Sequence, residues 1–500
     1  MARLMYLREP GKIAPPRAPH CRGAPNTGPI MSPILRTATV TTTLLGLGLA
    51  AAPVTAAPAP VAATPKPPVD LLPAPAAAPT PAVPETSTPT PTPTPAPVTP
   101  PAPIAAPMPL AHWTKGDAAA LLTAIEGVAD EGLFAADYKP ADLRAALAAG
   151  EGEALDTAAA RSFTWLVEDL RDGRTPITAR VQYFALDKDM DVSPTAALMA
   201  RALDTHDVAG VLAALNPVHP DYAVLRSALA ALPRGTAGTG PQATLIRANM
   251  DRWRWLTHDM GSAYLITNIP EYQLRLTVND KIIRTYRTIV GKPGRTATPQ
   301  LSETVQAVVF NPTWTVPQSI VVGEGLGRRL LGNRTSVVSG GYRATRAANG
   351  MMTVVQQPGP NNSLGLMKID MPNPHAIYLH DTPARGLFNS AVRAFSHGCV
   401  RTERAQELGM TMAILGAGMT PEQGVTNAMS GKYTRVTMTR TFPVYITYFT
   451  MAQDITGKLA TFADIYSRDA PLLASFAQPR ALKTSQRISN EAIVKLDNPL

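Results

Sequence analysis

A cysteine and three histidines lie close together in the last third of the chain. The three histidines are among eight in the whole sequence, and they fall within 23 residues. The four residues are His375, His380, His397 and Cys399. A thiol attacks well only as the thiolate, and free cysteine is mostly protonated near neutral pH. A neighbouring imidazole can take that proton and later return it to a leaving amine. The pattern therefore predicts nucleophilic catalysis by Cys399.

The residues beside Cys399 suit a carbonyl substrate. The segment Ser396–Arg401 reads Ser-His-Gly-Cys-Val-Arg. Gly398 has no side chain, so a substrate carbonyl can approach the main chain next to the sulfur. Adjacent N–H groups could then stabilise an oxyanion, which is often the largest catalytic term. Arg401 is a fixed cation suited to a substrate carboxylate.

Two other uses of Cys399 were weighed against catalysis. A structural zinc site needs four ligands and a catalytic one needs three, but the chain has no Cys-x-x-Cys or His-Glu-x-x-His segment. Asp381 is the only obvious acidic partner, so we expect no metal, and the sequence indicates no cofactor. The alternative of a buried core cysteine is weakened because the Ser-His-Gly-Cys run is polar.

The other cysteine, Cys21, lies in a segment that we expect to be removed. Residues 1–56 read as an export leader: Met31–Arg36 is a short basic start, an uncharged stretch follows, and Val54-Thr55-Ala56 offers a cleavage site. We hypothesise that translation begins at Met31. The apolar stretch is too short for a stable membrane span. We therefore expect an exported protein with a single thiol and no internal disulfide.

Composition divides the remaining chain. Residues 57–109 contain 20 of the 50 prolines, so we expect a disordered Pro/Ala/Thr-rich tether. The net charge of +9 includes +5 from residues 1–56, and a balance of +4 over the rest does not favour nucleic-acid binding.

Periodicity then predicts two folded domains. Apolar residues at three- and four-residue spacing predict a helical domain over 110–245, and Leu232–Pro241 breaks this pattern. A last helix is expected near Leu245–Trp255. Residues 246–475 contain many short alternating segments, which favour a mainly antiparallel sheet, and 476–500 remains as a tail. Asn279-Asp280 predicts a turn between two strands. The glycine- and arginine-rich residues 318–352 read as an inserted flap, and Gly323–Gly327 lacks the setting of a phosphate loop.

Several segments together resemble the L,D-transpeptidases with a YkuD-type catalytic domain. In that family a histidine lies a similar distance before a Ser-His-Gly-Cys segment, and here His380 precedes Cys399 by 19 residues. The resemblance includes the larger Gram-negative branch with its helical scaffold domain, and it covers about 110–475. The segments that carry it are Trp113, Glu131–Leu133, Asp137-Tyr138, Asn268–Arg275, Val290–Pro293, Asn311–Pro317, His380–Pro383, Arg393–Arg401 and Pro443–Tyr448. The resemblance implies an α+β multidomain fold. Unlike some relatives, the chain has no clear inserted peptidoglycan-binding module.

The resemblance implies roles for individual residues. Cys399 would be the nucleophile and His380 the general base and then acid, oriented by the main chain around Asp381. The pocket and oxyanion site would be shaped by Ser396, His397, Gly398 and Asp381, and substrate would be bound by Arg401, Tyr378 and Trp314.

The implied reaction is acyl transfer between peptidoglycan stem peptides in the periplasm. Cys399 would attack a tetrapeptide stem at the L-centre of diaminopimelate and release the terminal D-amino acid, and an amine of a second stem would resolve the thioester. That amine would belong to diaminopimelate or to the L-Ala at position one. The resemblance also implies inhibition by carbapenems. Three alternatives stay open: a hydrolase, in which water resolves the thioester, a ligase that attaches a protein to the wall, and a wall-binding protein without activity.

Overall fold

The computed structural model describes residues 111–186, 189–233, 240–323, 325–332, 340–480, 488–489 and 491. The expected leader (1–56) and tether (57–109) lie outside these residues. Within the described part, no helix combines the length and the apolar character needed to span a bilayer.

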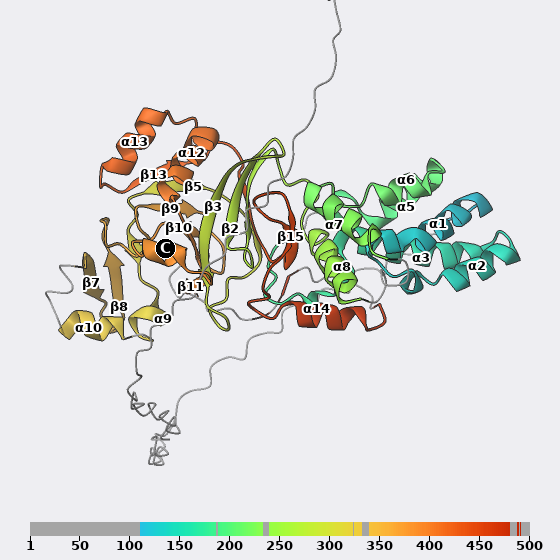
Figure 1. The fold of residues 1–500 in the computed structure, drawn as a ribbon, viewed down its shortest axis with the longest axis horizontal. Coiled ribbons are helices and arrows are strands. Elements are labelled where there is room, and N and C mark those ends of the chain that lie inside the picture. Colours follow the sequence, from blue (N-terminus) through green and yellow to red (C-terminus); the bar gives the residue numbers. More distant parts are fainter. Residues whose placement is uncertain are drawn as a thin grey trace, which may run out of the picture. The chain divides into compact units, whose positions relative to one another are not determined.

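The first half of the described chain is helical, as the sequence pattern predicts (Figure 1). Its helices are α1 (Lys115–Gly127), α2 (Pro140–Ala149), α3 (Glu153–Asp172), α4 (Asp189–Val192), α5 (Thr195–Asp204), α6 (Val208–Ala213), α7 (Pro220–Ala230) and α8 (Pro241–Trp253), with 3₁₀ helices at Val128–Glu131, Ala135–Tyr138 and Ile177–Ala179. Thr114 starts α1, since its hydroxyl accepts a hydrogen bond from the Asp117 N–H. Trp113, Leu121 and Phe163 are fully buried in the core shared by α1 and α3.

The second half is built on one mixed sheet. Its strands are β1 (Ala263–Asn268), β2 (Gln273–Val278), β3 (Lys281–Gly291), β4 (Leu301–Thr304), β5 (Ala307–Phe310), β9 (Met367–Asp370), β10 (Leu379–His380), β11 (Ala394–Ser396), β12 (Val400–Thr402), β13 (Thr434–Thr437) and β14 (Pro443–Thr447). They lie in the order β13-β5-β9-β10-β12-β3-β2-β1-β14-β4, with β11 paired to β3. The pairs β1–β14, β10–β12 and β11–β3 are parallel, and the other described pairs of this sheet are antiparallel. The predicted α+β fold class is confirmed.

The turn between β2 and β3 forms where the sequence predicts it. Asn279 and Asp280 have φ values of 48° and 59°, the left-handed conformation that a tight hairpin requires and that Asn and Asp tolerate.

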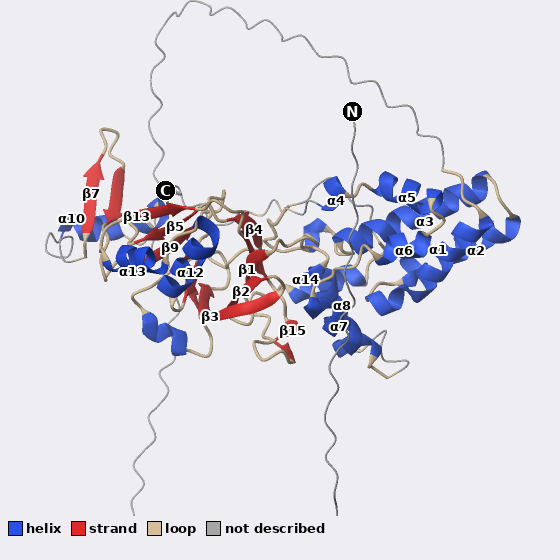
Figure 2. Ribbon diagram, turned by 90° about the horizontal axis from the view of Figure 1, so that it is seen from above, coloured by secondary structure: helices blue, strands red, loops and turns tan. Residues whose placement is uncertain are grey.

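Apolar side chains cover both faces of the sheet at β1. Leu265 points into the central core, which it shares with α12 (Ala405–Ala417), whereas Tyr264 and Ile266 on either side pack with α7 and α8. The same two helices lie beside the hairpin of β15 (Met451–Gln453) and β16 (Leu459–Thr461) (Figure 2). The fold continues with a 3₁₀ helix at Arg385–Asn389, α13 (Pro421–Met429) and α14 (Asp469–Phe476).

The end of the described chain returns to the helical half. Arg480 lies within the expected tail, and its guanidinium pairs with Glu168 and Asp169 of α3. Arg174, just after α3, donates to the main-chain carbonyls of Ser475 and Gln478. These contacts hold the segment after α14 against the scaffold helices.

The expected flap forms a small lobe of its own (Figure 1). This lobe extends beyond the expected bounds of 318–352, because it contains β6 (Trp314–Thr315), α9 (Gln318–Val321), α10 (Leu326–Gly332), β7 (Tyr342–Arg346) and β8 (Met352–Gln356). The strands pair in the order β6-β8-β7, and Val316, Val321, Leu330 and Val354 are buried among them. The described part of the flap therefore has its own sheet and its own apolar cluster.

Candidate active site

Strand pairing brings the chemical residues onto one face of the sheet. In β10, His380 lies opposite Arg401 of β12 on one side and Lys368 of β9 on the other. The neighbouring residues Leu379 and Val400 are fully buried and point into the central core. Because side chains alternate along a strand, His380, Arg401 and Lys368 occupy the opposite face.

His380 is held in one orientation. Its Nδ1 forms a short hydrogen bond with the main-chain carbonyl of Asp381. A carbonyl only accepts, so Nδ1 carries the proton and Nε2 keeps its lone pair. Burial, and then the positive charge of Arg401, lowers the pKa of His380 to about 3. The imidazole is therefore neutral at physiological pH and able to take a proton.

Cys399 is a neutral thiol in the resting protein. Its Sγ lies 3.6 Å from the carbonyl oxygen of Ala376, to which it donates. Burial raises the pKa of Cys399 to about 11, although hydrogen bonds from Tyr378 act in the opposite direction. The charges of Lys368 and Arg401 also favour the thiolate. Both side chains are thus uncharged at rest, and His380 can act as a base only if a bound substrate or a change in burial brings its pKa closer to that of the thiol.

The loop that carries Cys399 is fixed by hydrogen bonds. Ser396 Oγ accepts from the Gly398 N–H at 3.1 Å and donates to the Cys399 carbonyl at 2.6 Å. Gly398 has φ 119°, and a Cβ there would lie 2.9 Å from Ile377 Cδ1. The positive φ therefore requires glycine at this position, and the contact with the end of the Ile377 side chain adds crowding that a shift of that side chain relieves.

Thr298 anchors the same loop from a distant part of the chain. Its hydroxyl donates to the Gly398 carbonyl at 2.7 Å and accepts from the Gly291 N–H at 2.8 Å. The side chain is fully buried.

A cavity of about 210 Å³ lies over Cys399. Seven residues named in the sequence analysis line it: Trp314, Tyr378, His380, Ser396, His397, Cys399 and Arg401. Gly398 lies beneath the cavity and is not part of its lining. The flap contributes to the wall through Pro317 and Ile320.

The side chains of two residues from the sequence analysis, Asp381 and His375, make their contacts outside the cavity. The Asp381 carboxylate accepts from the Leu366 N–H and pairs with Arg385, so only the main-chain carbonyl of Asp381 reaches His380. The ring of His375 lies 4.0 Å from that of Phe184 and does not line the cavity.

Sequence reasoning missed Thr298 and Lys368. Lys368 carried one usable signal, because it is a charged residue within the largely apolar segment Leu366–Ile369. Thr298 carried none. Among the described residues, no three His, Cys, Asp or Glu side chains gather where they could hold a metal ion.

Comparison with known proteins identifies two domains. Residues 262–412 match the L,D-transpeptidase catalytic domain model of the YkuD family, and residues 111–229 match a scaffold domain model. A putative L,D-transpeptidase of Haemophilus influenzae is 32% identical over 219 residues. The chain therefore contains a YkuD-type catalytic domain of the L,D-transpeptidases. These are cysteine-dependent enzymes that act on peptidoglycan.

The similarity covers only part of each relative. The alignment with the Haemophilus influenzae protein covers 41% of this chain and 44% of that protein, so the chain spans less than half of its length. Among solved structures, an L,D-transpeptidase from Mycobacterium smegmatis is 14% identical, with 38% of this chain and 60% of that chain covered and a TM-score of 0.19. An L,D-transpeptidase in complex with imipenem is also 14% identical, with 37% of this chain and 59% of that chain covered and a TM-score of 0.18.

Proposed function

We propose that this protein is a peptidoglycan L,D-transpeptidase that links two stem peptides through a thioester on Cys399. The observation that supports this most strongly is the shared cavity of Cys399, His380 and Arg401, with His380 Nδ1 tied to the Asp381 carbonyl. The match of residues 262–412 to the catalytic domain agrees with this reaction, and the expected leader would place the enzyme in the periplasm.

The first step acylates the thiol. His380 Nε2 takes the proton from Cys399 as sulfur attacks the carbonyl carbon of the donor stem. The carbonyl oxygen becomes an oxyanion that N–H groups near Cys399 and the cation of Arg401 can stabilise. The tetrahedral adduct then collapses, the C–N bond breaks, and His380 returns the proton to the leaving D-amino acid.

The second step resolves the thioester. An amine of a second stem attacks the acyl carbon and gives a proton to His380. The C–S bond breaks, and the Cys399 sulfur recovers that proton. A hydrolase would use water in this step. A protein ligase would instead transfer the acyl group to an amine of a protein partner.

The test combines mass spectrometry with product analysis. The full chain is mixed with a carbapenem and its intact mass is measured, beside the Cys399→Ala variant. Both proteins are also incubated with tetrapeptide muropeptides, and the products are separated. Because Cys21 remains in the variant, loss of the adduct in Cys399→Ala assigns it to Cys399.

Each outcome separates the candidate functions. A single adduct and new dimers, both absent from the variant, support the transpeptidase, and fragmentation of the dimers names the acceptor amine. Release of D-amino acid without dimers favours a hydrolase. Turnover equal in wild type and variant contradicts the role of Cys399. No adduct and no turnover contradicts the catalytic proposal and favours a wall-binding protein.

A further inference from the structure

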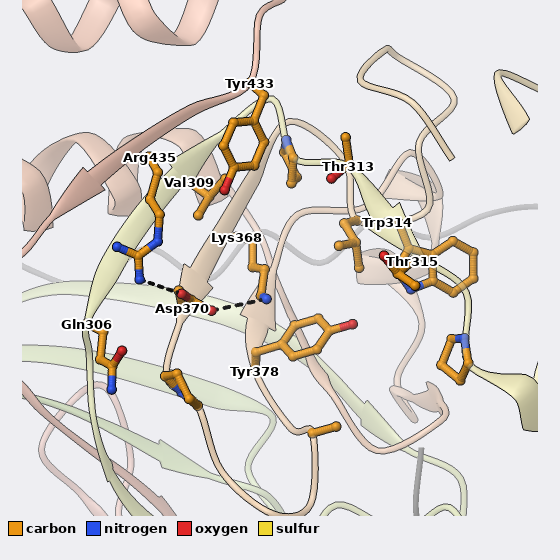
Figure 3. Close-up of a pocket in the computed structure, with 15 residues that line it drawn as sticks. Gln306, Val309, Thr313, Trp314, Thr315, Lys368, Asp370, Tyr378, Tyr433 and Arg435 are labelled. Atoms are coloured by element: carbon orange, nitrogen blue, oxygen red, sulfur yellow. Dashed lines mark hydrogen bonds and ion pairs between the residues drawn. The ribbon is translucent and has the colours of Figure 1, made fainter. Parts of the chain in front are cut away.

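A second cavity, shown in Figure 3, shares lining residues with the one over Cys399. Its volume is about 380 Å³, and Trp314 and Tyr378 line both cavities. Ala376 also lines the second cavity, and its carbonyl oxygen is the atom that accepts from Cys399 Sγ. The second cavity therefore begins at the main chain that contacts the nucleophile. Its volume is within the usual range for a small-ligand pocket, roughly 300–1,000 Å³.

Two cations and one carboxylate lie in this cavity. Asp370 is 6% exposed and pairs with Lys368 Nζ at 3.1 Å and with Arg435 Nη2 at 2.9 Å (Figure 3). Lys368 Nζ also lies 4.5 Å from the centre of the Tyr378 ring. One positive charge is left unbalanced by this cluster, which favours an anionic ligand.

Strand register connects this charge cluster to the catalytic residues. Arg435 lies opposite Val309, Val309 opposite Lys368, and Lys368 opposite His380. Directly opposite residues share a face of the sheet. Strands are ~4.8 Å apart, so Arg435 and His380 start ~14 Å apart on the same surface. An extended peptide of a few residues spans that distance.

A purely structural role explains the cluster less well. The main-chain ladder already joins β13 to β5 and β5 to β9. An exposed ion pair adds little to stability, and the Arg435 side chain is 35% exposed. Its guanidinium can therefore reach a ligand while it keeps its contact with Asp370. Tyr433, about half exposed, extends the lining beside Arg435.

We propose that this second cavity binds the acceptor stem peptide, and that Arg435 and Lys368 hold the carboxylate next to its attacking amine. This inference rests on the proposed function. A transpeptidase must hold two stems at once, whereas a hydrolase needs only one. The acceptor amine would reach the thioester from the side of Ala376 and Tyr378, while the cavity over Cys399 holds the donor. The cavity would thus favour the amine over water in the second step.

The test compares two acceptors and a matched pair of variants. The acceptors are a tripeptide stem that ends in diaminopimelate and the same peptide with the carboxyl next to its amine converted to an amide. Arg435→Gln removes the cavity's more exposed cation. Arg144→Gln removes an arginine that pairs with Glu126 on the scaffold surface, and it serves as the control. Thermal unfolding followed by circular dichroism verifies that each variant is folded.

We expect Arg435→Gln to raise the KM for the free-carboxylate acceptor about tenfold or more, as expected for loss of a charge-assisted hydrogen bond. The KM for the amidated acceptor should be similar in Arg435→Gln and wild type. Arg435→Lys, which keeps the charge, should recover part of the affinity, and Arg144→Gln should behave as wild type. An unchanged KM in Arg435→Gln overturns the inference. So does an equal slowing of D-amino acid release from the donor alone, since this would place the donor in the cavity.

A binding measurement keeps this inference separate from the proposed function. Titration calorimetry of the free-carboxylate acceptor is performed on Cys399→Ala with and without Arg435→Gln. Weaker binding in the double variant supports the acceptor cavity even if the wild type forms no dimers. Equal binding to both proteins, or no binding to either, contradicts it even if the wild type is an active transpeptidase.

Discussion

Replacing Thr298 by valine tests how a buried hydroxyl positions the nucleophile. Valine has nearly the same shape, so the change removes the hydroxyl and leaves the packing in place. It removes the hydrogen bond donated to the Gly398 carbonyl and the one accepted from the Gly291 N–H. Both main-chain groups belong to buried residues. Each unsatisfied buried group costs about 1–3 kcal/mol, so for the two groups we expect a loss of about 2–6 kcal/mol in the free energy of unfolding.

The same change should slow catalysis, because Gly398 immediately precedes Cys399. A displacement of ~1 Å at a reacting group can reduce the rate ~100-fold. Stability is measured by urea unfolding, and activity by the rate of D-amino acid release from a tetrapeptide donor. We expect both to fall in Thr298→Val and to recover in large part in Thr298→Ser, which restores the hydroxyl.

Thr402→Val is the matched control. Thr402 is also a fully buried threonine, on β12 of the same domain, but its hydroxyl has no hydrogen-bond partner among the described residues. Its replacement should therefore leave stability unchanged or raise it. If Thr298→Val is as stable as wild type, or if Thr402→Val loses as much stability, the reasoning from the Thr298 hydrogen bonds is wrong.

Four further results are expected. Gly398→Ala should lower the free energy of unfolding by about 1–3 kcal/mol, because this position has a positive φ, and it should abolish most D-amino acid release. Adding Ile377→Val should restore only part of the stability and activity, since it relieves the contact but not the φ strain. Full recovery would refute this. Burial raises the pKa of Cys399 to about 11, so alkylation of this thiol by iodoacetamide, followed by mass spectrometry, should still rise about tenfold per pH unit up to about pH 10; a plateau near pH 8 would contradict it. The pKa of His380 is lowered to about 3, so the base stays unprotonated above that pH and the profile of D-amino acid release should show no step near pH 6.5. Asp251→Asn should lower the free energy of unfolding by about 2–4 kcal/mol, measured by urea unfolding, because the Asp251 carboxylate accepts from the Arg174 and Thr175 N–H groups. An unchanged urea midpoint would exclude that role.

Much of the fold could be predicted because its signals are local. The turn at Asn279-Asp280 depends on two residues that tolerate positive φ, and helix α1 depends on the cap at Thr114 and on apolar spacing. The strand segments were found from their alternation. The Cys399 thiol was also found locally, because a cysteine in a polar segment that contains histidine has few other uses, whereas His380 was chosen among the three histidines only through the family resemblance.

Local patterns could not show which strands pair, and the site depends on that pairing. The parallel register of β10 and β12 sets His380 opposite Arg401, and the antiparallel register with β9 adds Lys368. The sequence spacing of His375 made it as good a candidate as His380, yet its ring packs against Phe184.

The sequence by itself determined the reacting groups, the alternation of the strands and the requirement for glycine before the nucleophile. The tertiary structure alone decided the electrostatics around the thiol, the anchor at Thr298 and the cavity that contains Arg435 and Asp370. The physical reason is that alternation and turn preference arise within a few residues of chain. Register, burial and the resulting pKa shifts arise from contacts between segments distant in sequence, and these are fixed only when the whole core packs.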